Sequence, residues 1–176
     1  MLPYSTYCLS HPKALALTPK QVKRFLKVDH DFDDDIIIAL IKSVTTQCQN
    51  YIGHALITQS WQTTYERVVR SSIRLPHKPV TQIDKVYLIN HKDRKIIYPD
   101  KFYGLVQELS EIEFYIQPIS KRIRIEYTCG FGDSYESIPE ELQTAMLQHI
   151  AYIYEHRGDG KEFNFGIYNN FKAIRF

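Results

Sequence analysis

The sequence is poor in the residue patterns from which metal, thiol and disulfide sites are built. It has three cysteines, Cys8, Cys48 and Cys129, which are odd in number and far apart in a chain of 176 residues. This spacing argues against a disulfide framework and suits a reducing compartment. No Cys-x-x-Cys or His-Glu-x-x-His pattern occurs among the cysteines and the seven histidines. We therefore expect neither a bound metal nor a cofactor.

Long hydrophobic runs and an excess of one charge are also lacking. No stretch approaches the ~20 apolar residues of a membrane span. The first residues lack the basic start and unbroken apolar core of a signal peptide. The formal net charge is only +2, so overall charge gives no argument for nucleic-acid binding. We expect a soluble, intracellular domain, with or without a large insertion, and no membrane partner.

The clearest positive signal is an amphipathic helix within residues 31–53. Its apolar residues recur every three or four positions over 37–52 and so share one face of a helix. Three aspartates at 33–35 lie in the first turn, at the positive end of the helix dipole. Gly53 stands where a left-handed residue usually ends a helix. Upstream, Thr-Pro-Lys-Gln at 18–21 is the capping box of a shorter first helix.

Residues 55–129 change from helical periodicity to the alternation of strands. In residues 122–128, for example, apolar and charged side chains alternate, so one face of that strand is expected to be exposed. Aromatic residues make up 13% of the chain, an excess that favours β-structure or broad contact surfaces. Turn residues divide this region into about six short antiparallel strands.

A third helix is expected after Pro139, with an apolar stripe wide enough to be buried on two sides. The predicted fold class is α+β, a helical core of three to four helices with an inserted antiparallel β-region. The expected segments are an N-terminal arm (1–17), a first helical-core segment (18–54), the β-insertion (55–129), a second helical-core segment (130–158) and a C-terminal tail (159–176). The arm is expected to be extended and ordered against a neighbour. A short fourth helix is expected at 167–173.

Three patterns suggest chemistry but fit a structural role better. The acidic run 29–35 begins like a calcium loop, yet Asp34 and Leu40 stand where such a loop needs Gly and Glu. Residues 130–133 lack the Lys-Ser/Thr ending of a P-loop and the third glycine of a dinucleotide fingerprint. His149 falls on the buried stripe of the third helix, where a core histidine is the simpler interpretation. An enzyme is therefore the weakest hypothesis, and we expect no catalytic residue.

Two sets of residues are candidates for contacts with other molecules. Basic residues in or beside the β-region either form ordinary solvated surface or face nucleic acid; they are Lys92, Arg94, Lys95, Arg122 and Arg124. The tail either completes the helical core or forms a docking surface for another chain; its candidate residues are Phe163, Phe165, Tyr168, Phe171, Arg175 and Phe176. For the second case we expect residues 158–176 to be poorly ordered in an isolated subunit.

Several segments together resemble the head–tail connector (adaptor) proteins of long-tailed bacteriophages, in the branch with a β-insertion that gene-transfer agents and prophages also carry. The segment GHALITQSW at 53–61 is similar to that family's Gly-x-Ala-Leu-x-x-Gln-x-Trp. Leu-Pro-x-x-Pro at 75–79 and Gly-Phe-Gly-Asp at 130–133, followed by Ile-Pro at 138–139, resemble its later motifs. Phe131 and Lys172 depart from the usual Tyr and Arg. The resemblance covers residues 18–176.

This resemblance implies a structural role rather than a catalytic one. Family members assemble as a ring, commonly twelve-fold, beneath the portal protein of the filled head. The ring extends the channel through which DNA passes without sequence specificity, and it receives a stopper or tail-completion protein. The implied location is the virion head–tail junction, with the host cytoplasm as the site of assembly. The alternative, from the residues alone, is a nucleic-acid-binding accessory protein that uses the basic residues of the β-region.

Overall fold

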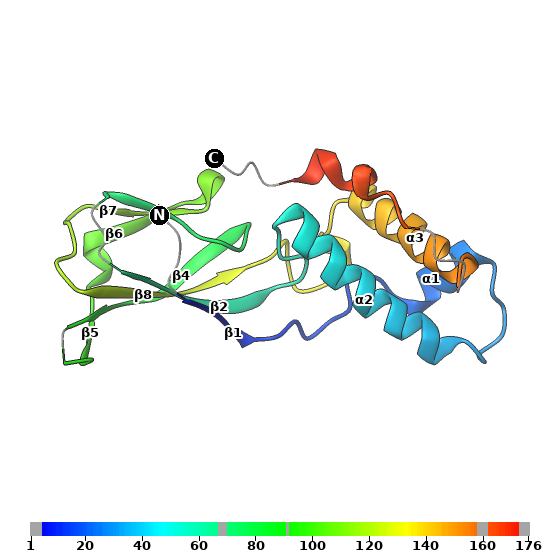
Figure 1. Ribbon diagram of the computed structural model, residues 1–176, viewed down its shortest axis with the longest axis horizontal. Coiled ribbons are helices and arrows are strands. Elements are labelled where there is room, and N and C mark those ends of the chain that lie inside the picture. The colour runs from blue at the N-terminus through cyan, green and yellow to red at the C-terminus, as the bar shows by residue number, and fades with distance from the viewer. Residues whose placement is uncertain (1–4, 67–69, 91, 158–161, 173–176) are drawn as a thin grey trace. The chain divides into compact units, whose positions relative to one another are not determined.

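The computed structural model describes residues 5–66, 70–90, 92–157 and 162–172, and it confirms an α+β fold (Figure 1). The chain divides into two compact units, each made from two separate stretches. We call Lys13–Ile57 with Phe131–Phe176 the helical unit, and Met1–Pro12 with Thr58–Gly130 the β unit. Among the described residues, none of the helices has the length and apolar character needed to cross a membrane.

The helical unit begins as the sequence predicts. Helix α1 (Pro19–Leu26) starts with a complete capping box, in which the backbone N–H of Gln21 donates to Thr18 Oγ1 at 3.2 Å and that of Thr18 donates to Gln21 Oε1 at 2.8 Å. Helix α2 (Asp34–Ile52) ends at Gly53, whose φ of 74° lies in the left-handed region where a side chain would be strained.

The rest of the helical unit closes the core around α2. Helix α3 is Glu140–Glu155, preceded by the short 3-10 helix η3 (Tyr135–Ser137). The predicted fourth helix is a 3-10 helix instead, η4 (Phe165–Phe171). The core residues come from all these elements and from the segments beside them; the larger ones are Leu17, Val22, Ile37, Ile41, Val44, Ile52, Leu56, Leu142, Met146, Ile150 and Tyr168.

The β unit contains two antiparallel sheets. The first has the order β1-β2-β8-β4-β5, built from Ser5–Ser10, Gln59–Glu66, Arg122–Cys129, Val80–Ile89 and Lys95–Ile97. The second has the order β3-β7-β6, built from Ser72–Arg74, Glu111–Phe114 and Tyr103–Val106. Two 3-10 turns, η1 (Asp100–Phe102) and η2 (Gln107–Leu109), flank β6. Of the eight strands that the described residues form, seven lie within residues 55–129, one more than predicted there, and the eighth is β1 of the N-terminal arm.

Strand β8 is the centre of the larger sheet and shows the predicted alternation. Ile123, Ile125 and Tyr127 are fully buried, while the alternating Arg122 and Arg124 are half-buried rather than exposed. The face of β8 that carries these arginines is less exposed to solvent than expected, because β8 has a neighbouring strand on each side. Both neighbours pair with it along almost its whole length.

The N-terminal arm is the main correction to the predicted architecture. Residues 5–10 were expected to be ordered against a neighbouring molecule, yet they form β1 and pair antiparallel with β2 of the same chain. Thr6 faces Thr63 and Cys8 faces Trp61 in this register. Edge strands of mixed polarity carry little periodic signal, so the sequence alone does not reveal the pairing.

Candidate functional site

The side chains of Cys48, Cys129 and His149 lie in packed cores. Burial raises the pKa of the Cys48 and Cys129 thiols to about 12, so both are held as unreactive thiols. Burial likewise lowers the pKa of His149 to about 4, so its ring is neutral near pH 7. Within the described residues, no three His, Cys, Asp or Glu side chains gather in a way that would hold a metal ion. These groups stabilise the fold and offer no accessible chemistry.

The aromatic residues of the tail surround His149. The Phe163 ring stacks on the imidazole with centroids 3.7 Å apart, and Phe165 meets it edge-on at 5.2 Å. Tyr168 is fully buried, and its hydroxyl shares a hydrogen bond of 3.1 Å with His149 Nδ1. We call Phe163, Phe165, Tyr168 and His149 the aromatic cluster. It fixes the tail to helix α3 of its own subunit.

The end of the tail is tied to helix α2 through Tyr51. The Tyr51 hydroxyl donates to Asn169 Oδ1 at 2.8 Å, and Lys172 Nζ lies 3.9 Å from the centroid of the Tyr51 ring. A lysine at this position therefore makes a cation–π contact. Phe171 is partly buried against the same core, and the predicted Arg175 and Phe176 lie outside the described residues.

Part of the tail completes the helical core, the first of the two alternatives given above, while the expected poor order of residues 158–176 in an isolated subunit stays a prediction. The described stretch, residues 162–172, packs on α2 and α3, with Tyr168 buried at its centre. A single chain therefore satisfies most of the aromatic surface that first suggested docking. The periodic apolar pattern in 163–171 is the signal that could have indicated packing.

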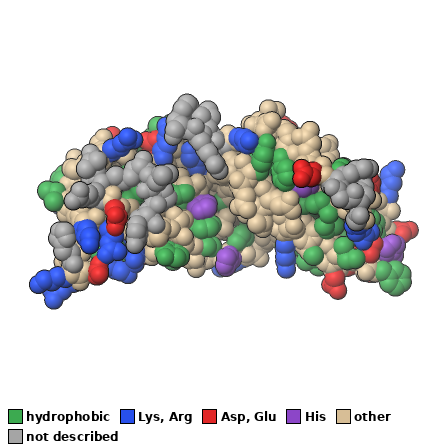
Figure 2. Space-filling model, viewed as in Figure 1, with side chains coloured by type: hydrophobic (Ala, Val, Ile, Leu, Met, Phe, Trp, Pro, Cys, Tyr) green, Lys and Arg blue, Asp and Glu red, His purple; other side chains and the backbone are tan. Residues whose placement is uncertain are grey.

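Lys and Arg side chains gather at one end of the β unit (Figure 2), where the sequence-predicted basic residues belong to the β4–β5 turn and to β8. Lys92, Arg94 and Lys95 are exposed in and after the turn that joins β4 to β5. Arg122 donates from its guanidinium to Asp93 of this turn. Arg124 lies two positions after Arg122 on the same face of β8, paired across the sheet with Thr64 and Tyr87. The structure thus places three of the five at this turn, with Arg122 and then Arg124 next to them on β8, and Arg122 is already neutralised by an ion pair.

Sequence reasoning missed the exposed apolar residues at the same end of the β unit. Ile96 and Ile97 of β5 are both exposed, as is Ile119 in the loop before β8. The signal was present, because two consecutive isoleucines in a three-residue strand cannot both face a core. Whether these isoleucines form a contact surface depends on neighbouring residues that only the fold brings close to them.

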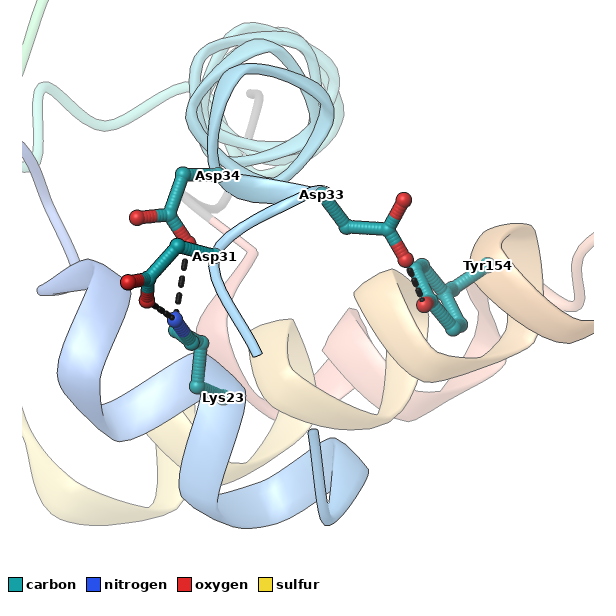
Figure 3. Close-up of polar contacts among 5 residues, drawn as sticks. All are labelled: Lys23, Asp31, Asp33, Asp34 and Tyr154. Carbon is teal, nitrogen blue, oxygen red and sulfur yellow. Dashed lines mark hydrogen bonds and ion pairs between the residues drawn. The ribbon is translucent and has the colours of Figure 1, made fainter. Parts of the chain in front are cut away.

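The acidic start of helix α2 is organised by Lys23 and Tyr154 (Figure 3). Lys23 Nζ lies 2.6 Å from Asp31 Oδ1 and 2.9 Å from Asp34 Oδ1. The hydrogen bond from Lys23, and then its charge, lower the pKa of Asp31. Asp33 accepts a hydrogen bond from the Tyr154 hydroxyl of α3 and makes no side-chain cap on α2.

This geometry corrects one detail of the sequence interpretation. Asp34 and Asp35 do lie in the first turn, where the helix dipole favours them. Asp33, predicted to lie in this turn, is instead the N-cap residue, and its side chain makes no cap hydrogen bond because its carboxylate accepts from Tyr154 of α3. The carboxylates thus bind a lysine and a tyrosine of their own unit.

Comparisons with known proteins connect this fold to virus particles. The model of a family described as "HCP: Head completion protein" matches residues 16–166. A search of curated protein sequences finds no match. Among solved structures, a chain of the "Neck of empty GTA particle computed with C6 symmetry" is similar at 18% identity and a TM-score of 0.83, over 98% of this chain and 97% of that one.

Two further solved structures contain chains with a similar fold. A chain of the "Virion of native gene transfer agent (GTA) particle" is similar at 19% identity and a TM-score of 0.79, over 97% of this chain and 96% of that one. A chain of the "Neck of native GTA particle computed with C12 symmetry" is similar at 18% identity and a TM-score of 0.73, over 97% of both chains. At such identities the likeness establishes a shared fold, and it spans both units.

Proposed function

The chain belongs to the head completion protein family and is a structural head–tail connector subunit, and from this premise we propose that its copies assemble as a ring beneath the portal of a tailed phage or prophage. The ring would extend the DNA channel and receive a stopper or tail-completion protein. We infer that the subunit acts by assembly rather than by catalysis.

The observation that carries this proposal is the family match over residues 16–166, which runs through both units. A match confined to one unit would leave the other free to supply a separate activity. The fold is shared over nearly the whole chain with proteins in necks solved with sixfold and twelvefold symmetry. We propose twelve subunits for this ring, because the resemblance in sequence implies that number. Any such ring needs two different contact surfaces on each subunit.

The tail is the proposed segment for binding the portal. Phe163, Phe165, Tyr168 and Phe171 would anchor it to the helical unit through the contacts described above. Arg175 and Phe176, which follow this anchored segment, would reach the portal. In this proposal the aromatic cluster positions the end of the tail, and Arg175 and Phe176 make the contact with the portal.

Binding to portal rings from the same viral genome tests whether the last residues of the tail make the portal contact. Deleting residues 173–176 should abolish binding without lowering the thermal stability, because the described core contacts of the tail come from residues before 173. Asn170→Ala, a change at an exposed position of η4, is the matched control and should bind normally. Full portal binding by the shortened chain would exclude residues 173–176 as the portal contact.

A further inference from the structure

Three exposed isoleucines lie at one end of the β unit. Ile96 belongs to β5, on the same face of the chain as Tyr98, and Ile116 and Ile119 belong to the loop between β7 and β8. Ile119 is 94% exposed, so this side chain gains nothing from the fold of its own subunit. We call these three residues the isoleucine patch. Large apolar side chains grouped on a surface indicate a site of contact.

Hydrogen bonds hold the two segments of the isoleucine patch together. The Tyr98 hydroxyl, directly after β5, donates to the carbonyl of Ile116 at 2.5 Å. Ser120 Oγ donates to the carbonyl of Ile89 at 2.7 Å, and Ile89 pairs with Lys95 across β4 and β5. The loop and the strand are therefore fixed side by side. A surface already fixed in place loses little conformational entropy on binding.

Exposed cations lie close to the isoleucine patch along the chain. Lys92, Arg94 and Lys95 precede or begin β5, and Lys121 follows Ile119 by two positions. Lys and Arg side chains gather over this end of the β unit (Figure 2). A partner that combines an apolar side chain with several carboxylates would satisfy both the apolar contact and the opposite charge of this surface.

The helical unit of the same protein carries a surface of that composition. Phe32 is 92% exposed in the turn between α1 and α2, and its ring lies 5.6 Å from that of His30. Across residues 27–36, five aspartates stand against Lys27 alone, and Ile36 is also exposed. We call residues 29–36 the acidic turn.

The acidic turn is held in one conformation by the contacts of Figure 3. Lys23 binds both Asp31 and Asp34, one on each side of Phe32, and Tyr154 binds Asp33. The phenyl ring is therefore presented to solvent by a fixed turn. Such an exposed aromatic anchor with a charged rim is typical of interface residues.

We propose that the acidic turn of one copy docks on the isoleucine patch of the next, with Phe32 inserted among the isoleucines and the aspartates facing the nearby lysines. This inference rests on the proposed ring and names one of its contacts between subunits. The two surfaces differ, so each copy offers one of each, and the contact runs head to tail as a ring requires. Pairing of either surface with itself would place like charges together.

Charge reversal tests the contact without disturbing the bonds that fix it. One variant combines Asp29→Lys with Asp35→Lys, which leaves the contacts of Lys23 and Tyr154 intact. The other combines Lys92→Glu with Lys95→Glu. All four positions are outside the buried core. Self-association is measured by analytical ultracentrifugation at low ionic strength, up to millimolar protein, on the full chain.

Each double variant should weaken self-association about tenfold or more relative to wild type. The chain that carries all four changes should regain association, and so should an equal mixture of the two double variants, because lysine then faces glutamate. Phe32→Ser, a change at an exposed position, should weaken association without reversing any charge. Lys42→Glu with Glu108→Lys, also exposed, is the control and should leave association unchanged.

Association that is unaffected by either reversal, or not regained in the combined chain, would overturn the proposed contact. A wild-type chain that stays monomeric at every concentration would do the same. If the reversed variants still form rings on the portal, the contact fails while the proposed function stands. If wild type does not join the portal, the proposed function itself fails. Loss of portal binding without loss of self-association would assign the acidic turn to the portal and overturn the contact between copies.

Discussion

At the scale of single residues, His149 has an environment unlike that of water. Burial among aromatic rings disfavours the imidazolium and lowers the pKa to about 4, whereas an unfolded chain has a histidine pKa of about 6.5. The unfolded state therefore binds more protons between these values. Stability from the neutral ring is present above about pH 6.5 and is lost as the pH falls towards 4.

We predict that the helical unit becomes less stable over that interval, by at most about 1.4 kcal/mol per pH unit from this residue. Hydrogen exchange of the α3 amides at pH 7.5 and pH 5 measures the change locally. His149→Gln should reduce the dependence on pH, while the exposed His11→Gln should leave it as in wild type. Equal dependence in all three proteins would contradict the assigned environment.

Thr18 is a second residue with a defined local role. Thr18→Ala removes the acceptor for the N–H of Gln21 and should lower the free energy of unfolding of the helical unit by about 1 kcal/mol. Thr46→Ala, on the exposed face of α2, is the matched control, since Thr46 only donates back to the carbonyl of Lys42. Urea denaturation followed by far-ultraviolet circular dichroism compares the two. An equal effect of both changes would rule out the capping box as a special contribution.

At the scale of elements, η4 depends on one buried ring. We predict that Tyr168→Ala lowers the free energy of unfolding by about 3 kcal/mol or more, because it empties the centre of the aromatic cluster. Tyr168→Phe should cost about 1 kcal/mol, the contribution of the hydrogen bond to His149. The exposed Asn170→Ala should change stability by less than about 0.5 kcal/mol. Thermal and urea unfolding of the three variants test this order.

The two stretches of the helical unit meet where the β unit departs. The N–H of Phe131 donates to the carbonyl of Leu56 at 3.3 Å, so a short linker can join these positions. We predict that residues 13–57, linked by glycine and serine to 131–176, fold into the helical unit alone. Circular dichroism should show helix that melts cooperatively. A chain that stays unfolded would show that the helical unit needs the β unit to fold.

The elements themselves follow from the sequence where the signal is local. The capping box at Thr18, the left-handed Gly53 and the alternation of β8 all depend on residues close together in the chain, and all three are present. Strand β1 does not follow, because its partner lies more than fifty positions away. The packing of the tail does not follow either, because its rings find their core through His149 of another helix.

At the scale of the whole molecule, the predicted fold class and family are confirmed, whereas the candidate surfaces needed the structure. The isoleucine patch joins Ile96 with Ile116 and Ile119, and no local pattern connects them. The acidic turn was visible as a run of aspartates. Its exposed phenylalanine and its fixing by Lys23 were not, because both depend on how α1 meets α2.

The most direct test of the connector function is electron microscopy of the full chain mixed with portal rings from the same viral genome. We expect an added ring of density on one side of the portal, with this fold repeated around the channel and one subunit for each portal subunit. Portal rings that remain bare at saturating protein, or that bind it only as scattered single copies, would contradict the assignment.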